Sequence, residues 1–246
     1  MVKISLVNYL NSFPFKFGLE NFKFIESPKI EFDIPSVCAK KLIEKQVDIG
    51  LVPVAILPQL NYYELVSDFC ISANGPVDSV KVYSHHPIEE ISELILDYHS
   101  RTSAQLVKIL CREKWKINPV FLPSDTGYEN SIIGTRAGLV IGDRTFEMNG
   151  RFPFEYDLSL EWKTLTGLPF VFAVWVSNRP IEDENFINQL NQALKFGVQN
   201  IEKSIVDYKS VVPNFDPAFY LKKRIEYEFS SEKKQAMEKF LAMILY

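Results

Sequence analysis

The sequence has few cysteines and histidines and no long apolar run, and each absence excludes a class of protein. Its 246 residues include three cysteines and three histidines. The cysteines are widely spaced and lack a Cys-x-x-Cys pair, so we expect reduced thiols in a cytoplasmic protein rather than a disulfide framework. No metal-ligand spacing such as His-x-x-x-His occurs, which argues against a zinc site. No apolar stretch approaches the roughly 20 residues that a membrane-spanning helix needs.

A basic surface, a signal peptide and the common nucleotide motifs are also missing. The formal net charge is −4 and basic residues do not form a stripe, so we expect no nucleic-acid partner. The N-terminal segment becomes strand-like at once, which is not typical of a signal peptide, and we expect a cytoplasmic location without a membrane partner. Gly-x-Gly-x-x-Gly, Gly-x-x-x-x-Gly-Lys-Ser/Thr and Gly-x-Ser-x-Gly do not occur. The motifs therefore offer no dinucleotide, nucleotide or serine-hydrolase chemistry.

What is present is an alternation of short apolar runs and helical stripes. The first third reads as strand, helix, strand, with Ser36 as the predicted N-cap of the helix and a buried strand at 47–53. The middle repeats this order, with a capping box formed by Thr102 and Gln105 at the start of a helix. The last seventy residues show helical spacing of apolar residues. The remaining predicted strands lie near residues 4–6, 30–32, 80–84, 94–97, 139–143 and 170–176.

This order predicts an α/β fold of two lobes, each a mostly parallel sheet flanked by helices, with a ligand cleft between them. One lobe would hold residues 1–80 plus 177–246, and the other residues 85–174. No Gly/Ser-rich tether is present, so we expect the chain to cross between the lobes at strands, near 80–84 and 174–177.

Four polar clusters follow predicted strands, where open α/β sheets bind their ligands. They are residues 8–12, 75–79, 100–103 and 142–143. Each has a simpler interpretation. Asn11 or Ser12 and Asp143 could serve merely as helix caps, and residues 75–79 could be merely a turn. Ser100, Arg101, Thr102 and Ser103 together exceed what capping needs and suit a carboxylate or phosphate at a helix N-terminus. From the residues alone, the sequence indicates a two-lobed protein that binds a small anion.

Six stretches together resemble a known family, the chorismate dehydratases of menaquinone biosynthesis by the futalosine route. They occur in the family's order and cover most of residues 1–180, whereas position 8 is Asn where the family often has Ser. The stretches are Tyr9-Leu-Asn-Ser-Phe-Pro14, Val47-Asp-Ile-Gly-Leu-Val-Pro53, Gly75-Pro-Val-Asp-Ser-Val80, Ser100-Arg-Thr-Ser103, Ile141-Gly-Asp143 and Trp162-Lys-Thr-Leu-Thr-Gly-Leu-Pro-Phe-Val-Phe-Ala-Val-Trp175.

The resemblance implies a fold like the type 2 periplasmic binding proteins and the conversion of chorismate to 3-[(1-carboxyvinyl)oxy]benzoate, with no metal or organic cofactor. By carry-over, Asn11 and Ser79 are the side chains expected closest to the chemistry. The residues expected to bind the substrate are Ser100, Arg101, Thr102, Ser103, Asp143 and Ser36. The base is not evident; the substrate's enolpyruvyl carboxylate is one candidate, and Asp143 is a less favoured one.

Three other interpretations share this fold. A transport protein would bind a small carboxylate without turnover, and the effector lobe of a transcription regulator would need a helix-turn-helix domain. A sister lyase, 1,4-dihydroxy-6-naphthoate synthase, relies on a histidine in its cleft, whereas the matches here follow the dehydratase pattern. The oligomeric state stays open, with a homodimer as one option.

Overall fold

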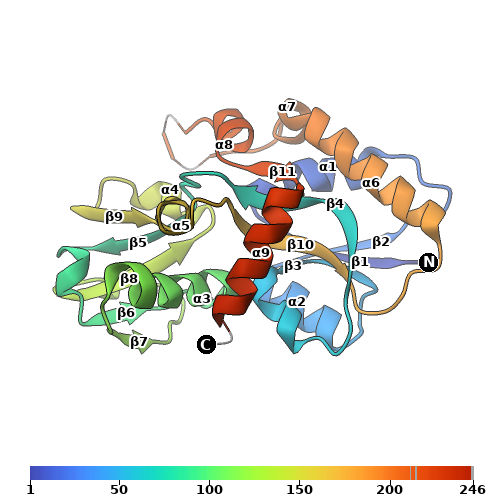
Figure 1. Ribbon diagram of the computed structural model, residues 1–246. Helices are drawn as coiled ribbons and strands as arrows, with labels where there is room; N and C mark the ends of the chain where they lie inside the picture. Colours follow the sequence, from blue (N-terminus) through green and yellow to red (C-terminus); the bar gives the residue numbers. More distant parts are fainter. Residues whose placement is uncertain (211, 214, 245–246) are drawn as a thin grey trace.

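The strands of this chain form two sheets, one in each of two lobes, in a computed structural model that describes residues 1–210, 212–213 and 215–244. Within these residues the first sheet has six strands in the order β11-β4-β10-β3-β1-β2, and the second has five in the order β7-β6-β8-β5-β9 (Figure 1). The strands are β1 Lys3–Val7, β2 Lys29–Asp33, β3 Ile49–Pro53, β4 Glu64–Ala73, β5 Val80–Ser84, β6 Glu93–Ile95, β7 Val120–Leu122, β8 Arg136–Ile141, β9 Phe154–Asp157, β10 Phe170–Ser177 and β11 Glu226–Glu228.

Helices flank both sheets. The α-helices are α1 Phe13–Asn21, α2 Pro35–Ile43, α3 Arg101–Leu110, α4 Arg144–Met148, α5 Leu158–Thr166, α6 Glu184–Gln199, α7 Ile201–Ser204, α8 Pro217–Lys223 and α9 Ser231–Ile244. Short helical turns at Leu10–Ser12, Val54–Gln59, Ile88–Glu90 and Tyr128–Ser131 join some of these elements, and a π-turn at Cys111–Trp115 extends α3.

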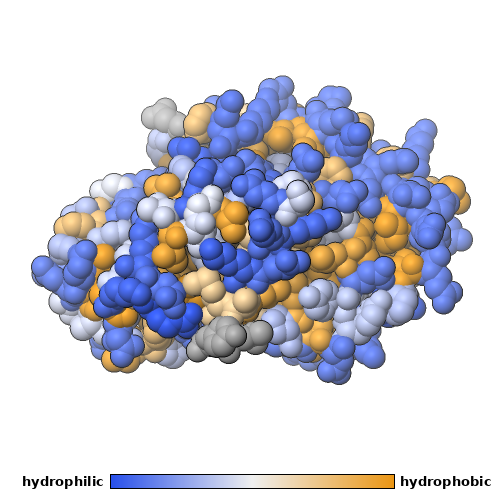
Figure 2. Space-filling model, viewed as in Figure 1, coloured by the Kyte–Doolittle hydropathy of each residue, from blue (hydrophilic) through white to orange (hydrophobic). Residues whose placement is uncertain are grey.

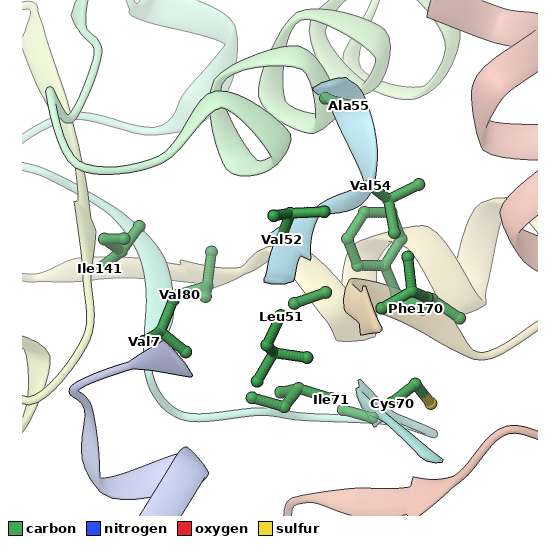
Figure 3. Packing of buried hydrophobic residues seen from close by; sticks show 14 of the residues in the cluster. Val7, Leu51, Val52, Val54, Ala55, Cys70, Ile71, Val80, Ile141 and Phe170 are labelled. Carbon is green, nitrogen blue, oxygen red and sulfur yellow. The ribbon is translucent and has the colours of Figure 1, made fainter. Parts of the chain in front are cut away.

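The core of the first lobe is built on its two central strands. All five residues of β3 are buried, and β10 lies between β3 and β4 with most of its residues buried as well. Continuous apolar runs are expected for strands that are covered on both faces. Figure 3 shows this packing, with Val7 and Val80 near each other although they come from different sheets.

The sheets are mixed rather than mostly parallel, which corrects the prediction. In the first sheet β1 pairs in parallel with β2 and β3, but β10 runs antiparallel to both of its neighbours. In the second sheet β5 runs antiparallel to β8 and β9. The reason is topological: the chain leaves the first sheet, builds the second, and returns through β10 in the opposite direction.

The chain passes between the sheets at two places, residues 74–79 before β5 and the segment containing α5 before β10. The whole of β5 belongs to the second sheet and the whole of β10 to the first. The lobe boundaries expected from the sequence stay a prediction, and residues 211, 214 and 245–246 of that prediction lie outside the described residues.

At the passages, the Asp157 carboxylate accepts hydrogen bonds from the backbone N–H groups of Val77 and Asp78 and also from those of Ser159 and Leu160. One buried carboxylate therefore ties the two passages together.

Most of the C-terminal region is helical as predicted, but residues 178–183 and 205–210 are not. Asn200 separates α6 from α7, and β11 pairs antiparallel with the edge of β4. The buried residues of α9 are Lys233, Ala236, Met237 and Phe240. This helix contacts β10 in the first lobe and α3 in the second, so it lies across both (Figure 1). Its outer surface is mostly hydrophilic in Figure 2, as expected for one buried stripe.

Two predicted helix caps are wrong. Helix α2 has Ile34 at its N-cap rather than Ser36, because Pro35 occupies the first helical position and keeps the preceding residue extended. Helix α3 is capped by Ser100, whose side chain accepts a hydrogen bond from Ser103 N, and not by Thr102. The Thr102 hydroxyl instead donates to the Phe172 carbonyl and accepts from Ala55 N.

Helices α1 and α6 pack with their backbones in close approach. A Cβ atom at Gly18 would overlap the carbonyl oxygen of Ala193, and one at Gly197 would overlap the carbonyl oxygen of Pro14. Both positions therefore need glycine for packing rather than for an unusual backbone conformation.

Candidate functional site

A cavity of about 60 Å³ lies where the two sheets meet. We call it the interlobe cavity. Most of its lining residues are apolar, and the polar ones follow the carboxyl ends of β1 and β6 or precede β5. This is where open α/β sheets place their ligands. Its walls are Val7, Tyr9, Asn11, Pro35, Pro53, Ile71, Val77, Ser79, Val80, Ser100, Thr102, Ser103, Ile141, Gly142, Phe172 and Ala173.

The structure brings five of the eight sequence-predicted site residues to this cavity: Asn11, Ser79, Ser100, Thr102 and Ser103. Ser100 and Ser103 are both buried at the start of α3. The Ser100 hydroxyl donates to Ser103 Oγ at 2.9 Å. Since Ser103 Oγ already accepts this bond, its own proton remains for another acceptor, so the N-terminus of α3 offers hydrogen-bond donors to the cavity.

Three predicted residues do not line the cavity. Arg101 is exposed and donates to Gln59 Oε1 at 3.0 Å, which directs its charge elsewhere. Ser36 is half-buried on α2, next to the lining residue Pro35. Asp143 follows the lining residue Gly142, and burial raises the pKa of its carboxyl group to about 6, partly offset by a hydrogen bond with the backbone of Leu10.

Asn11 contributes an unpaired polar atom. Its side-chain oxygen is buried and has no hydrogen-bond partner among the described residues. An acceptor buried in this way costs about 1–3 kcal/mol unless something pairs with it. A bound molecule with a hydroxyl group would supply the missing donor, and we take this atom as a mark of a ligand site.

Ser79 is 2% exposed, and its hydroxyl oxygen accepts a hydrogen bond of 2.8 Å from the hydroxyl of Tyr220. Tyr220 lies in α8, where no motif of the sequence indicates a site residue. Only the packing of α8 against the first passage between the lobes, residues 74–79, could have found it.

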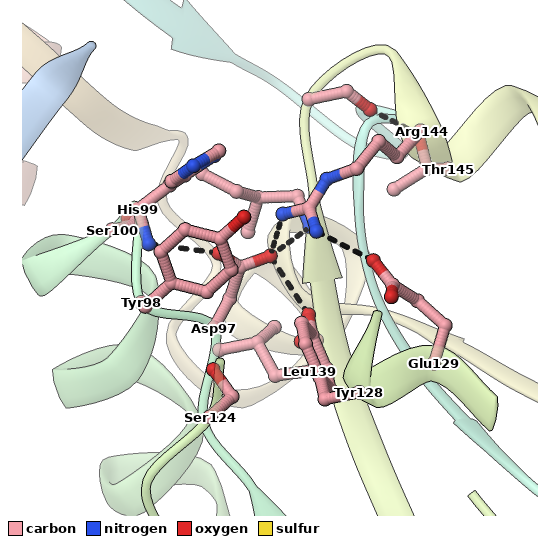
Figure 4. Close-up of polar contacts among 12 residues, drawn as sticks. Asp97, Tyr98, His99, Ser100, Ser124, Tyr128, Glu129, Leu139, Arg144 and Thr145 are labelled. Atoms are coloured by element: carbon pink, nitrogen blue, oxygen red, sulfur yellow. Dashed lines mark hydrogen bonds and ion pairs between the residues drawn. The ribbon is translucent and has the colours of Figure 1, made fainter. Parts of the chain in front are cut away.

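Sequence reasoning also missed a buried ionic network beside the cavity (Figure 4). The side chain of Asp97 is fully buried, and its Oδ2 accepts hydrogen bonds from Tyr128, Ile141 N and Arg144. Arg144 also pairs with Glu129. The guanidinium is therefore already matched by two carboxylates. The signal in the sequence was a lone aspartate two residues after β6, which is weak evidence by itself.

The network fixes the loop that carries the polar end of the cavity. Asp97 Oδ1 accepts from His99 N at 2.8 Å, and the His99 ring reaches the first lobe, where Nδ1 lies 2.7 Å from the Tyr9 hydroxyl. Burial lowers the pKa of His99, which favours a neutral ring. Tyr9 in turn lines the cavity and covers Gly142.

No group of three or more His, Cys, Asp and Glu side chains is arranged to hold a metal ion in the part of the chain that the structure describes. Within the same part, no helix is long and apolar enough to cross a membrane.

The sequence is similar to one family over nearly its whole length. The family described as "Menaquinone biosynthesis" matches residues 2–245. Over 195 residues the chain is 27% identical to the chorismate dehydratase of Thermus thermophilus. This alignment covers 72% of this chain and 69% of the relative. Over 246 aligned residues it is 24% identical to the chorismate dehydratase of Campylobacter jejuni. This second alignment covers 96% of this chain and 94% of the relative.

Solved structures with little sequence identity share the fold. A protein of Archaeoglobus fulgidus matches with a TM-score of 0.77 and 12% identity, covering 98% of this chain and 96% of its own. The periplasmic aliphatic sulphonate binding protein SsuA of Escherichia coli matches with a TM-score of 0.62 and 11% identity, and the match covers 99% of this chain and 86% of SsuA. The predicted two-lobed fold, like that of the periplasmic binding proteins, is thus confirmed.

Proposed function

Because the chain belongs to the menaquinone biosynthesis family, we propose that it is a hydro-lyase that removes one water molecule from chorismate and forms 3-[(1-carboxyvinyl)oxy]benzoate. The two curated relatives described above are both named chorismate dehydratase. The observation that carries the proposal is the interlobe cavity, which combines apolar walls with hydroxyl and amide groups and has no charged side chain among its described lining residues.

Neutral donors would hold the substrate. Chorismate carries one carboxylate on its small carbon ring and a second on the enolpyruvyl ether, and apolar walls such as Val80, Ile141 and Phe172 would contact the ring. The hydroxyl of Ser103 and the free N–H groups at the start of α3 would bind one carboxylate. Arg101 and Arg144 are each paired with other side chains, so the proposal gives neither of them to the substrate.

The reaction breaks a C–H bond and a neighbouring C–O bond of the ring. The base takes the proton from the carbon that bears the enolpyruvyl ether and passes it to the hydroxyl on the adjacent carbon, which departs as water. Negative charge spreads through the diene onto the ring carboxylate, where fixed donors stabilise it as it develops. Asn11 would orient the departing hydroxyl through its unpaired oxygen, and Ser79 would donate to the substrate.

The base in this proposal is the enolpyruvyl carboxylate of the substrate itself. Asp143 is the alternative, but it is not among the residues that line the cavity. Because aromatisation drives the step, a strong base is unnecessary, and we propose that no metal or organic cofactor takes part. We further propose a cytoplasmic protein without a nucleic-acid or membrane partner; its three cysteines are all buried free thiols.

Incubation of the chelator-treated protein with chorismate tests the proposal. Chromatography with mass detection should show an aromatic product that has lost one water and retains the enolpyruvyl group. Ser79→Ala and Asn11→Ala should each lose most of the turnover, whereas Ser92→Ala, which changes an exposed serine beyond the cavity, should not. Saturable binding without product would instead indicate a binding protein, and loss of activity on chelation would contradict the cofactor-free reaction.

A further inference from the structure

We propose that Tyr220 is a positioning residue, which directs the hydroxyl proton of Ser79 into the interlobe cavity. This inference rests on the proposed function, since it assigns a task to a residue of the same site. It concerns α8, which lies in the C-terminal region outside the stretches that carry the family resemblance.

The backbone around Ser79 is fixed from both sides. Val77 N and Asp78 N donate to the Asp157 carboxylate at 2.9 and 2.7 Å. The Ser79 carbonyl accepts from Gly142 N at 2.8 Å. Asp78 also pairs with Arg224, which directly follows α8. The position of Ser79 is thus determined, and the rotation of its hydroxyl is what remains to be set.

Tyr220 sets that rotation. Its hydroxyl donates to Ser79 Oγ at 2.8 Å, so the serine oxygen already accepts one hydrogen bond and its proton must point elsewhere. Ser79 lines the cavity, and an acceptor on the substrate is the partner that this arrangement leaves open. A serine that accepts from one hydroxyl while it donates to another is the stronger donor, because hydrogen bonds in a chain polarise one another.

The tyrosine itself has little freedom. It is 2% exposed, and its ring packs edge-on against Phe146, with 5.1 Å between the centroids. Burial raises its pKa well above the ordinary value, so the phenol keeps the proton that it donates. The role is therefore to orient and polarise Ser79, without contact to the substrate.

The test is a double-mutant cycle in the full chain with chorismate as substrate. Tyr220→Phe keeps the ring and removes the donor, and we expect kcat to fall about five- to tenfold with little change in KM, as the loss of one hydrogen bond of about 1 kcal/mol predicts. In the Ser79→Ala background the same change should alter kcat less than about twofold, because the serine that it positions is absent.

Tyr83→Phe is the matched control. The Tyr83 hydroxyl is equally buried and donates to the Thr145 carbonyl away from the cavity. The variant should therefore lose a similar amount of stability and keep the kcat of the wild type. The inference would be overturned if Tyr220→Phe and Tyr83→Phe lost kcat equally. It would also be overturned if Tyr220→Phe lowered kcat in the Ser79→Ala background as much as in the wild type. A wild-type protein that does not convert chorismate would instead refute the proposed function. If Ser79→Ala loses most of its turnover while Tyr220→Phe keeps all of it, this inference alone is refuted.

Discussion

The hydroxyl of Tyr9 and Nδ1 of His99 lie 2.7 Å apart, although the two residues belong to different lobes. Tyr9 follows β1 of the six-stranded sheet, and His99 follows β6 of the five-stranded sheet. This hydrogen bond therefore forms only when the lobes are together around the cavity.

Removal of this bond should weaken substrate binding more than turnover. Tyr9→Phe keeps the ring that covers Gly142 but loses the hydrogen bond, so the closed arrangement loses about 1 kcal/mol. We expect KM for chorismate to rise about three- to tenfold and kcat to change less than about twofold. Steady-state kinetics would measure both constants. Tyr98→Phe, which removes an exposed hydroxyl next to His99 in sequence, should leave KM unchanged.

Asp143 should make stability fall as pH rises from about 4 to about 6. Burial raises the pKa of its carboxyl group to about 6 in the folded protein, whereas the unfolded chain has a pKa near 3.9. Between these values the folded state holds more protons, so folding is favoured at the acidic end and this advantage is lost on the way to neutral pH.

Asp143→Asn removes this effect and tests it. We expect the variant to be about 1–3 kcal/mol more stable than the wild type in urea unfolding at pH 7.5, with the difference vanishing below pH 4. Asp125→Asn, at an exposed site, is the control and should change the stability at pH 7.5 by less than about 0.5 kcal/mol. A variant that is less stable than the wild type at pH 7.5 would argue that the ionised Asp143 is stabilising.

The close approach of α1 and α6 should not tolerate a methyl group. In Gly197→Ala the new Cβ would meet the carbonyl oxygen of Pro14, and neither backbone can move without displacing its helix. We expect a loss of about 3 kcal/mol or more in the free energy of unfolding, the upper end of overpacking effects. Asn188→Ala on the exposed face of α6 should change stability by less than about 0.5 kcal/mol. Thermal and urea unfolding would compare the two.

Substrate affinity should depend little on salt. The described lining residues of the interlobe cavity carry no charge, so the substrate carboxylates would meet dipoles rather than ions. We expect KM for chorismate to stay constant or to fall slightly between about 0.05 and 0.5 M NaCl. The described lining offers no cation whose attraction salt could screen, whereas salt weakens the repulsion between the anionic substrate and the net negative protein. A KM that rises steeply with salt would mean that an arginine or lysine binds the substrate.

The sequence predicted the elements near the site better than their arrangement. Apolar runs such as 49–53 and 170–177 are strands, since a strand covered on both faces needs no polar alternation. Strand direction is not encoded in such runs, and the antiparallel return of β10 was therefore missed. The short edge strand β11 was missed too, because three residues give no periodicity.

At the site, too, local features could be predicted from the sequence, whereas their arrangement in space could not. Local signals, namely polar residues directly after strands, led to Ser100 and Ser103 at the cavity. Arg101 carries the same signal, yet its side chain reaches Gln59 instead, since neighbouring residues on a helix point in different directions. Tyr220 lies 141 residues from Ser79, and only tertiary packing brings such a pair together.

The passage of the chain through both lobes has a consequence for biosynthesis. The second sheet lies between parts of the first in sequence, and α9 packs against both lobes. While a ribosome is still making residues after β10, the five-stranded sheet has all its strands, but Tyr220, β11 and α9 have not yet been added. A nascent chain at that stage has its serines in place without the partner that orients Ser79. Full catalytic activity would therefore be reached only late in translation, once α8 has been added.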